Sequence, residues 1–310
     1  MSYATIKTAA SKSETTILPM LTSMRPAGSK AEKTFIKEWI TPLGVEADRA
    51  GNLIKRIGDA PVLWSCHTDT VHFRGGRQAI AYGDGVVTLH DTKTGPNCLG
   101  ADDTAGVWLM REMILAQRPG LYVFHRGEER GGIGSSYIAD TTPGLLDGIQ
   151  CAIALDRAST TDVITYQAGG RCCSNAFATS LAAQLLPGFK PCDRGVFTDT
   201  ANYTTLVSEC TNLSVGYYNQ HMASERLDLH FLYDLRDALL ALDTRDLTIA
   251  RDPSAYEVTW SKYDSWDAMD EDNETLVSLI RKYPDETARV MLDFGLRAED
   301  ILAQVRFDRY

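Results

Sequence analysis

The feature that most constrains the fold is the alternation of short apolar runs with segments of helical periodicity. The strand-like runs cover residues 51–58, 60–67, 119–127, 148–158 and 205–219. The helical segments cover residues 12–24, 29–41, 104–117, 131–140 and 232–246. Strands that alternate with helices typically form a mostly parallel sheet with helices on its faces. We therefore expect an α/β fold in which a mostly parallel mixed sheet is flanked by helices.

Two shorter patterns add local detail. Ser29 is followed three positions later by Glu32, a capping-box pattern that predicts the start of the helix over 29–41. The stretch "YGDGVVTLHD" within the long connection after residue 67 predicts a short hairpin.

The character of the chain changes after residue 252. A polar and aromatic stretch with little periodicity is followed by three short helix-like segments. We therefore divide the chain into a main domain over residues 1–252 and a helical C-terminal appendage over 253–310. The appendage contains no histidine and no cluster of reactive side chains, so packing or self-association, including a homo-oligomer, is its expected role.

Charge and hydropathy exclude some classes of partner. The 310 residues are 44% hydrophobic, enough for one sizeable core, and carry a formal net charge of −10 without a dense Lys/Arg block. Nucleic acids and anionic membranes are therefore not expected as partners. No window approaches the ~18 consecutive apolar residues of a membrane span, and the N-terminal residues lack the apolar stretch of a signal peptide.

The seven cysteines indicate reduced thiols. Their number is odd and their spacing irregular, which fits a cytoplasmic protein better than a disulfide framework. We interpret the adjacent Cys172 and Cys173 as small buried hydrophobic residues rather than as a redox pair.

Acidic residues and histidines recur where the predicted strands end or the helices begin. The stretch "SCHTDTV" ends one strand, and comparable positions follow or precede the others: His67, Asp69, Asp102, Asp103, Glu128, Glu129, Asp156, His221 and Glu225. Each one alone has an ordinary explanation, such as a helix cap or a solvated turn. In open α/β sheets, however, sites form outside the carboxyl ends of the strands, so these side chains are expected to converge.

Such a set matches the needs of a two-metal site. Histidine and carboxylate ligands suit Zn²⁺, and one carboxylate can bridge two ions. We assign Asp102 as the bridge, His67 with Asp156 to one ion, and His221 with Glu129 to the other. Glu128 then remains beside a ligand as the general base. Asp69 is expected to hydrogen-bond the ring of His67 and orient it.

The order of these motifs resembles the co-catalytic di-zinc exopeptidases. This clan includes bacterial leucyl aminopeptidases, deblocking aminopeptidases, tripeptidase T and carboxypeptidase G. The resemblance covers about residues 12–245 and rests on motifs in the order "HTDTV", "GADDTAG", "GEERGGIGS", "ALD" and "YYNQHMASE". The flanking stretches "ADRAGNLI" and "TDTANY" also resemble segments of the clan.

The resemblance implies the same site residues and a zinc-exopeptidase-like fold. It carries the metal set to His67, Asp102, Glu129, Asp156 and His221, with two Zn²⁺ or, alternatively, Mn²⁺ or Co²⁺. It makes Glu128 the base that deprotonates a water activated by the two ions, and Asp69 the orienting residue. Asp103 is then a helix cap or a supporting partner.

Other polar residues are expected to lie outside the chemistry. The remaining histidines match no motif and are interpreted as structural or surface residues: His72, His90, His125 and His230. Arg74 and Arg77 are expected to be surface residues rather than anchors for an anionic substrate group. Cys66 should point away from His67 into the core, because successive side chains of a strand alternate between faces.

The spacing also bears on the kind of exopeptidase. Many clan members carry a lid domain inserted before the bridging aspartate or before the final histidine, and neither gap here is long enough to hold one. The resemblance therefore implies the aminopeptidase-like branch, with the connection over 70–100 as a remaining wall of the site. The alternatives are an amidohydrolase that acts on N-acyl amino acids or other small amides and, in another class, a catalytically idle binding or scaffold protein.

Overall fold

The computed structural model describes residues 17–93, 95–255, 280–284 and 287–288. The chain divides into two compact units, residues 1–255 and residues 256–310. Most of the predicted C-terminal appendage, and the first part of the helix predicted over 12–24, lie outside the described residues. The helical character of the appendage stays a prediction.

A mixed sheet with a parallel centre forms the framework of the first unit. Its order is β13-β10-β14-β9-β4-β8-β3-β2. The bounds in chain order are β2 Glu46–Ala47, β3 Leu53–Ile57, β4 Val62–His67, β8 Gly120–His125, β9 Cys151–Arg157, β10 Asp162–Ile164, β13 Lys190–Cys192 and β14 Glu209–Ser214. Strands β14, β9, β4 and β8 run parallel, whereas β3 and β2 on one side and β10 on the other pair antiparallel to their inner neighbours. The expected α/β sheet is confirmed.

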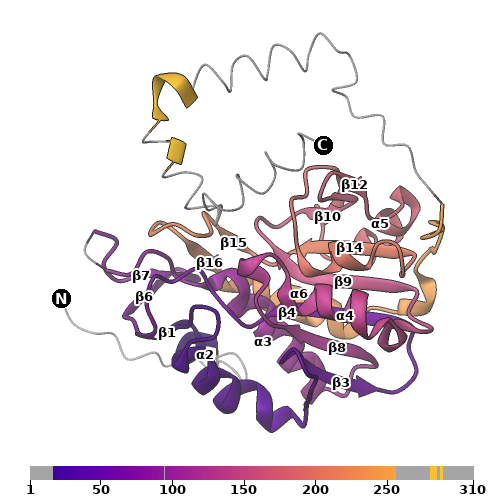
Figure 1. Cartoon of the computed structure of the whole chain (residues 1–310), viewed down its shortest axis with the longest axis horizontal. Helices are drawn as coiled ribbons and strands as arrows, with labels where there is room; N and C mark the ends of the chain where they lie inside the picture. The colour runs from indigo at the N-terminus through magenta and orange to yellow at the C-terminus, as the bar shows by residue number, and fades with distance from the viewer. Residues whose placement is uncertain (1–16, 94, 256–279, 285–286, 289–310) are drawn as a thin grey trace, which may run out of the picture. The chain divides into compact units, whose positions relative to one another are not determined.

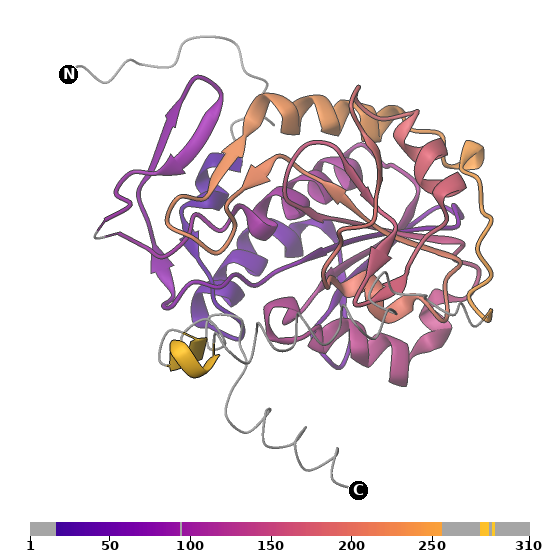
Figure 2. The ribbon, with the colours of Figure 1, turned by 90° about the horizontal axis from the view of Figure 1, so that it is seen from above.

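Helices cover both faces of this sheet (Figures 1 and 2). Their bounds are α1 Ile17–Leu21, α2 Lys30–Phe35, α3 Ala101–Leu115, α4 Ile133–Thr141, α5 Asn175–Ala182 and α6 Leu229–Ala241. Helices α3 and α6 lie on one face and α4 on the other. Among the described residues, no helix is both long and apolar enough to cross a membrane.

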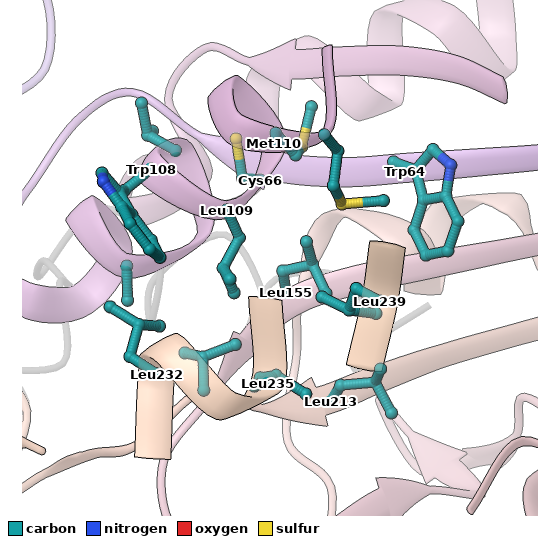
Figure 3. Close-up of a cluster of buried hydrophobic side chains, with 14 of the residues drawn as sticks. Trp64, Cys66, Trp108, Leu109, Met110, Leu155, Leu213, Leu232, Leu235 and Leu239 are labelled. Atoms are coloured by element: carbon teal, nitrogen blue, oxygen red, sulfur yellow. The ribbon is translucent and has the colours of Figure 1, made fainter. Parts of the chain in front are cut away.

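Strands β4, β8 and β9 are mostly apolar because both of their faces are buried. Along β4, Trp64 and Cys66 belong to the larger core cluster, which includes Trp108 of α3 and Leu235 of α6, whereas Leu63 joins the smaller cluster on the opposite face. Figure 3 shows the larger cluster, with Cys66 among its side chains. The predicted direction of Cys66 is therefore confirmed.

All seven cysteines are buried and unpaired. Cys172 and Cys173 are each 0% exposed and belong to different core clusters, as expected for small hydrophobic residues. Cytoplasmic location stays a prediction.

The helix predicted over 29–41 begins as expected and changes type along its length. Ser29 accepts a hydrogen bond from the Glu32 N–H (3.0 Å), and the Glu32 carboxylate accepts the N–H of Gly28 (2.6 Å). Helix α2 continues into a π-helix over Ile36–Ile40 and a 3-10 turn over Thr41–Leu43, which Gly44 ends at a φ of 72°.

Smaller sheets surround the main one. The predicted hairpin is β6 (Ile80–Gly83) and β7 (Val86–Leu89), joined by Asp84 and Gly85, which both have positive φ as a two-residue type I′ turn requires. Strand β7 pairs with β16 (Arg226–Asp228), which pairs with β15 (Tyr217–Tyr218). Two further short pairs are β1 (Ser23–Met24) with β5 (Gly76–Arg77) and β11 (Tyr166–Gln167) with β12 (Gly170–Arg171).

Candidate metal centre

The predicted site residues meet at the carboxyl edge of the parallel strands. His67 ends β4, and Asp156 lies near the end of β9. Glu128 and Glu129 occupy the turn after β8. Asp102 precedes the regular part of α3, because it and Asp103 have non-helical backbone angles. His221 lies in the loop between β15 and β16.

Asp102 lies between the two histidines. Its Oδ1 is 3.0 Å from His67 Nε2 and its Oδ2 is 3.2 Å from His221 Nε2. On the outer sides, Asp156 Oδ1 is 3.5 Å from His67 Nε2 and Glu129 Oε1 is 3.1 Å from His221 Nε2. A carboxylate with one oxygen toward each histidine has the geometry that a bridge between two ions requires.

The structure thus contains two overlapping groups of three. We call His67, Asp102 and Asp156 the His67 half-site, and Asp102, Glu129 and His221 the His221 half-site. In each group, one possible ligand atom per residue lies within 4.8 Å of the others. Glu128 forms a third such group with His67 and Glu129, within the same limit of 4.8 Å. The two half-sites bring together the residues that the sequence assigned to each ion, and their role as ligands stays a prediction.

Burial, together with repulsion between neighbouring carboxylates, disfavours the ionised forms of the acidic side chains in this cluster. Burial raises the pKa of Glu128 well above its ordinary value, and raises that of Glu129 to about 7. For His221, burial lowers the pKa, but the hydrogen bonds and charges of Asp102 and Glu129 outweigh it and raise the value to about 11. Positive charge bound between these carboxylates would therefore stabilise their ionised forms.

The residues present fit divalent cations. Within the part of the chain that the structure describes, no lysine or arginine forms an ion pair with the four carboxylates of the cluster. Uncompensated buried charge costs several kcal/mol or more. Neutral histidines with carboxylates are the donor set that zinc and related ions take.

His67 is held so that Nε2 faces the carboxylates. Its Nδ1 lies 3.1 Å from the backbone carbonyl oxygen of Asp69 and 3.6 Å from the Asp69 carboxylate. A neutral ring that donates its Nδ1–H to this carbonyl leaves the Nε2 lone pair toward Asp102 and Asp156.

The Asp69 carboxylate has a second function. Its Oδ1 accepts the N–H groups of Gly127 (3.1 Å) and Glu128 (3.3 Å), and the residue is fully buried. Asp69 therefore contacts both the ring of His67 and the turn that carries Glu128. Sequence reasoning anticipated only the first of these contacts.

Asp103 caps the helix, as predicted. Its Oδ1 accepts the N–H of Gly106 (2.9 Å), and its Oδ2 accepts the N–H of His67 (3.2 Å). The same side chain thus fixes the start of α3 and the end of β4.

Two side chains that support Asp156 were not predicted. The Thr198 hydroxyl donates to Asp156 Oδ2 (2.8 Å), and the Tyr217 hydroxyl donates to Oδ1 (3.2 Å). Thr198 begins the stretch "TDTANY", whose likeness to the clan was the only available signal.

A pocket opens over the cluster, and its walls differ from the expected ones. Beyond the carboxylates and His221, the lining residues are Arg157, Ala158, Ile164, Gln167, Gly195, Val196, Phe197, Asn212, Tyr217 and Gln220. The connection over 70–100 contributes no described residue to this lining, so its predicted role as a wall is wrong. The walls come instead from the chain between Asp156 and His221.

The other four histidines, Arg74 and Arg77 do not line the pocket. His90 and His230 are exposed, and His72 is buried. His125 is buried below the sheet edge, where its ring contacts the hydroxyls of Ser65 (3.1 Å) and Tyr203 (2.6 Å). Arg74 and Arg77 are exposed, as expected for surface residues.

Comparison with known proteins places the fold among peptidases. No protein-family model and no curated protein sequence matches the chain. Among solved structures, a tripeptidase from Staphylococcus aureus shares 16% identity, with a TM-score of 0.57 over 74% of this chain and 96% of that one. A PepT aminopeptidase from Bacillus cereus shares 16% identity, with a TM-score of 0.53 over 74% and 96%. The TET1 peptidase of Pyrococcus horikoshii shares 14% identity, with a TM-score of 0.52 over 74% and 98%.

The chain therefore has the α/β fold of tripeptidases and aminopeptidases. This confirms, at the level of the fold, the resemblance to the exopeptidase clan that the order of the motifs indicated.

Proposed function

We propose that this protein is a metal-dependent hydrolase of amide bonds, and specifically an exopeptidase of aminopeptidase type. The observation that carries the proposal is the position of Asp102, with one carboxylate oxygen toward each of His67 and His221. In this proposal, two Zn²⁺ are held by His67, Asp102 and Asp156 on one side and by Asp102, Glu129 and His221 on the other. Mn²⁺ or Co²⁺ could replace Zn²⁺ at such ligands.

The two ions, when bound, supply Lewis-acid polarisation of the scissile carbonyl and lower the pKa of water. Glu128 lines the pocket beside the ligands and supplies the proton transfer. One of its carboxylate oxygens takes a proton from the attacking water and later passes it to the nitrogen of the leaving amine. Asp69 fixes the turn that places Glu128 for both transfers.

The charge of the pocket walls favours a substrate with a free amine over one with a free carboxylate. Arg157 is the one arginine among the described lining residues, and its guanidinium is already engaged. It donates to Asp162 Oδ2 (3.3 Å) and to the Arg194 carbonyl oxygen (3.0 Å). A hydrolase of N-acyl amino acids would need an available cation for the substrate carboxylate. That activity is the second candidate, and a catalytically idle relative is the third.

The test combines metal analysis with a hydrolysis screen of aminoacyl anilides, dipeptides and N-acetylated amino acids. Wild type should carry two ions per chain and cleave substrates with a free amine. Glu128→Gln should keep both ions and lose at least ~10²-fold in rate, the usual size of a general acid–base effect. Full activity in Glu128→Gln would refute the assignment of the base, and cleavage restricted to N-acetylated amino acids would select the second candidate.

Two further variants complete this test. His221→Ala removes a proposed ligand and should lose metal, which elemental analysis detects. Glu38→Gln removes an exposed carboxylate from the π-helix and should change neither metal content nor rate.

We also propose self-association. The TET1 peptidase of Pyrococcus horikoshii is described as able to assemble into a tetrahedron or a large octahedral shell. Light scattering on the purified full chain would measure the assembly, and a mass equal to one chain at micromolar concentration would contradict this proposal.

A further inference from the structure

One buried carboxylate joins the turn that carries Asp102 to the loop that carries His221. Glu225 is 0% exposed, and glutamate is rarely buried so fully unless its charge is paired. Its Oε2 accepts the N–H groups of Leu99 and Gly100, both at 2.8 Å. Its Oε1 accepts the N–H of Asp102 at 3.0 Å. Glu225 therefore contacts the site through the backbone of Asp102.

The turn before α3 is shaped to hold this carboxylate. Gly100 has a φ of 71°, in the left-handed region that glycine adopts readily. With this turn, the N–H groups on both sides of Ala101 point toward one carboxylate, an arrangement that binds anions well. Glu225 itself lies at the end of the loop between β15 and β16, four positions after His221.

We propose that Glu225 is a positioning residue for the His221 half-site. It ties the turn that carries the bridging Asp102 to the loop that carries His221, so that both reach the same ion. This inference rests on the proposed two-metal function and adds a determinant of metal affinity outside the ligand set.

The two half-sites depend on Glu225 to different degrees. In the His67 half-site, His67 and Asp156 belong to adjacent parallel strands of the sheet. In the His221 half-site, Asp102 and His221 lie in the two segments that Glu225 joins. The His221 side chain is also 41% exposed, so little packing holds it in place. Loss of Glu225 should therefore weaken the His221 half-site more than the His67 half-site.

The test is metal stoichiometry of Glu225→Gln in the full chain. Gln keeps the size of the side chain but replaces one carboxylate oxygen with an NH₂ group. This NH₂ group cannot accept the backbone N–H groups that the oxygen accepted. Protein is dialysed against a series of buffered free Zn²⁺ concentrations and its zinc is quantified by mass spectrometry. We expect wild type to hold two ions. In the variant, the first ion should be retained and the second should bind about 10- to 100-fold more weakly, as for other residues that orient ligands.

Glu209→Gln is the matched control. Glu209 is also 0% exposed, and it accepts four hydrogen bonds, from Ser174 N, Ser174 Oγ, Ala250 N and Arg251 N. Both variants should lower the melting temperature, but Glu209→Gln should keep both ions. Equal retention of zinc in Glu225→Gln and wild type would overturn the inference, and so would equal weakening of both ions.

A second variant covers the case in which Glu225→Gln does not fold. Glu225→Asp keeps the charge and shortens the side chain by one methylene, so its second-ion affinity should also fall below that of wild type. A wild-type affinity in Glu225→Asp would overturn the inference. If wild type itself bound no zinc, the proposed function would fail instead, so the two failures are distinguishable.

Discussion

The Nδ1 atom of His67 is closer to the backbone carbonyl oxygen of Asp69, at 3.1 Å, than to the Asp69 carboxylate, at 3.6 Å. The ring can therefore keep its orientation without the carboxylate. The carboxylate meanwhile accepts the N–H groups of Gly127 and Glu128. The side chain of Asp69 should matter more for the placement of Glu128 than for the proposed binding of metal by His67.

This predicts a separation between rate and metal content. Asp69→Ala removes the acceptor for the Glu128 turn, so kcat should fall by about 10- to 100-fold while two ions remain bound. Asp69→Asn keeps one oxygen acceptor and should have a smaller effect. Steady-state kinetics with elemental analysis checks both variants. Loss of one ion in Asp69→Ala would show instead that the carboxylate is needed to orient His67.

Gly106 lies where no side chain fits. A Cβ there would be 2.3 Å from the Leu155 carbonyl oxygen and about 2.5 Å from the carboxylate of Asp103. Gly106→Ala should therefore displace α3 from β9 and lower the free energy of unfolding by about 1–3 kcal/mol, the usual cost of overpacking. Chemical denaturation measures the change. Gly83→Ala is the control, because a Cβ at Gly83 meets nothing within 4 Å, and an equal loss in both variants would contradict the packing argument.

Arg25 is a fully buried cation beneath the site. Its Nε donates to the Thr68 carbonyl oxygen and one terminal nitrogen donates to the Thr104 hydroxyl, both at 2.8 Å. Lysine cannot make both bonds, so Arg25→Lys should lower the free energy of unfolding by about 2–4 kcal/mol. Arg77→Lys, at a side chain that is 58% exposed, should stay within about 0.5 kcal/mol in the same denaturation experiment. Similar values for the two variants would contradict the role assigned to Arg25.

His72 predicts a specific dependence of stability on pH. Burial, reinforced by the charge of Arg25, lowers the pKa of His72 to about 4 in the folded chain. The unfolded chain, with a histidine pKa of about 6.5, binds a proton that the folded chain does not bind between these values. Stability should therefore fall by about 3 kcal/mol through this group as the pH drops from about 6.5 to about 4.

The measurement is the free energy of unfolding as a function of pH for wild type, His72→Asn and His90→Asn. The His90→Asn variant is the control, because His90 is an exposed histidine next to the hairpin. His72→Asn should show a shallower loss of stability toward acid than wild type, whereas His90→Asn should follow wild type. Parallel curves for all three proteins would show that His72 does not drive the acid sensitivity.

The sequence was sufficient to predict the parallel centre of the sheet and the meeting of the site residues at one edge of it. Strands β4, β8 and β9 are mostly apolar runs, and each carries an acidic residue or histidine at its end. Because parallel strands end at one edge, positions such as His67 and Asp156 can be brought together without knowledge of side-chain contacts.

The pocket walls and the role of Glu225 could not be predicted in this way. Both depend on contacts between segments more than 40 residues apart, such as Glu225 with the turn at Leu99 and Gly100. No local period or motif encodes which of two long connections folds over the site. Pairings between distant short strands, such as that of β7 with β16, likewise leave little trace in the sequence.

The span of the site along the chain has a consequence for biosynthesis. His67 leaves the ribosome long before His221, and Asp102 contacts both histidines in the folded chain. If two ions bind as proposed, the second can be captured only by a chain whose synthesis has passed His221. Metal uptake would then be a late step in maturation, and the ratio of zinc to protein would report how many molecules had completed folding.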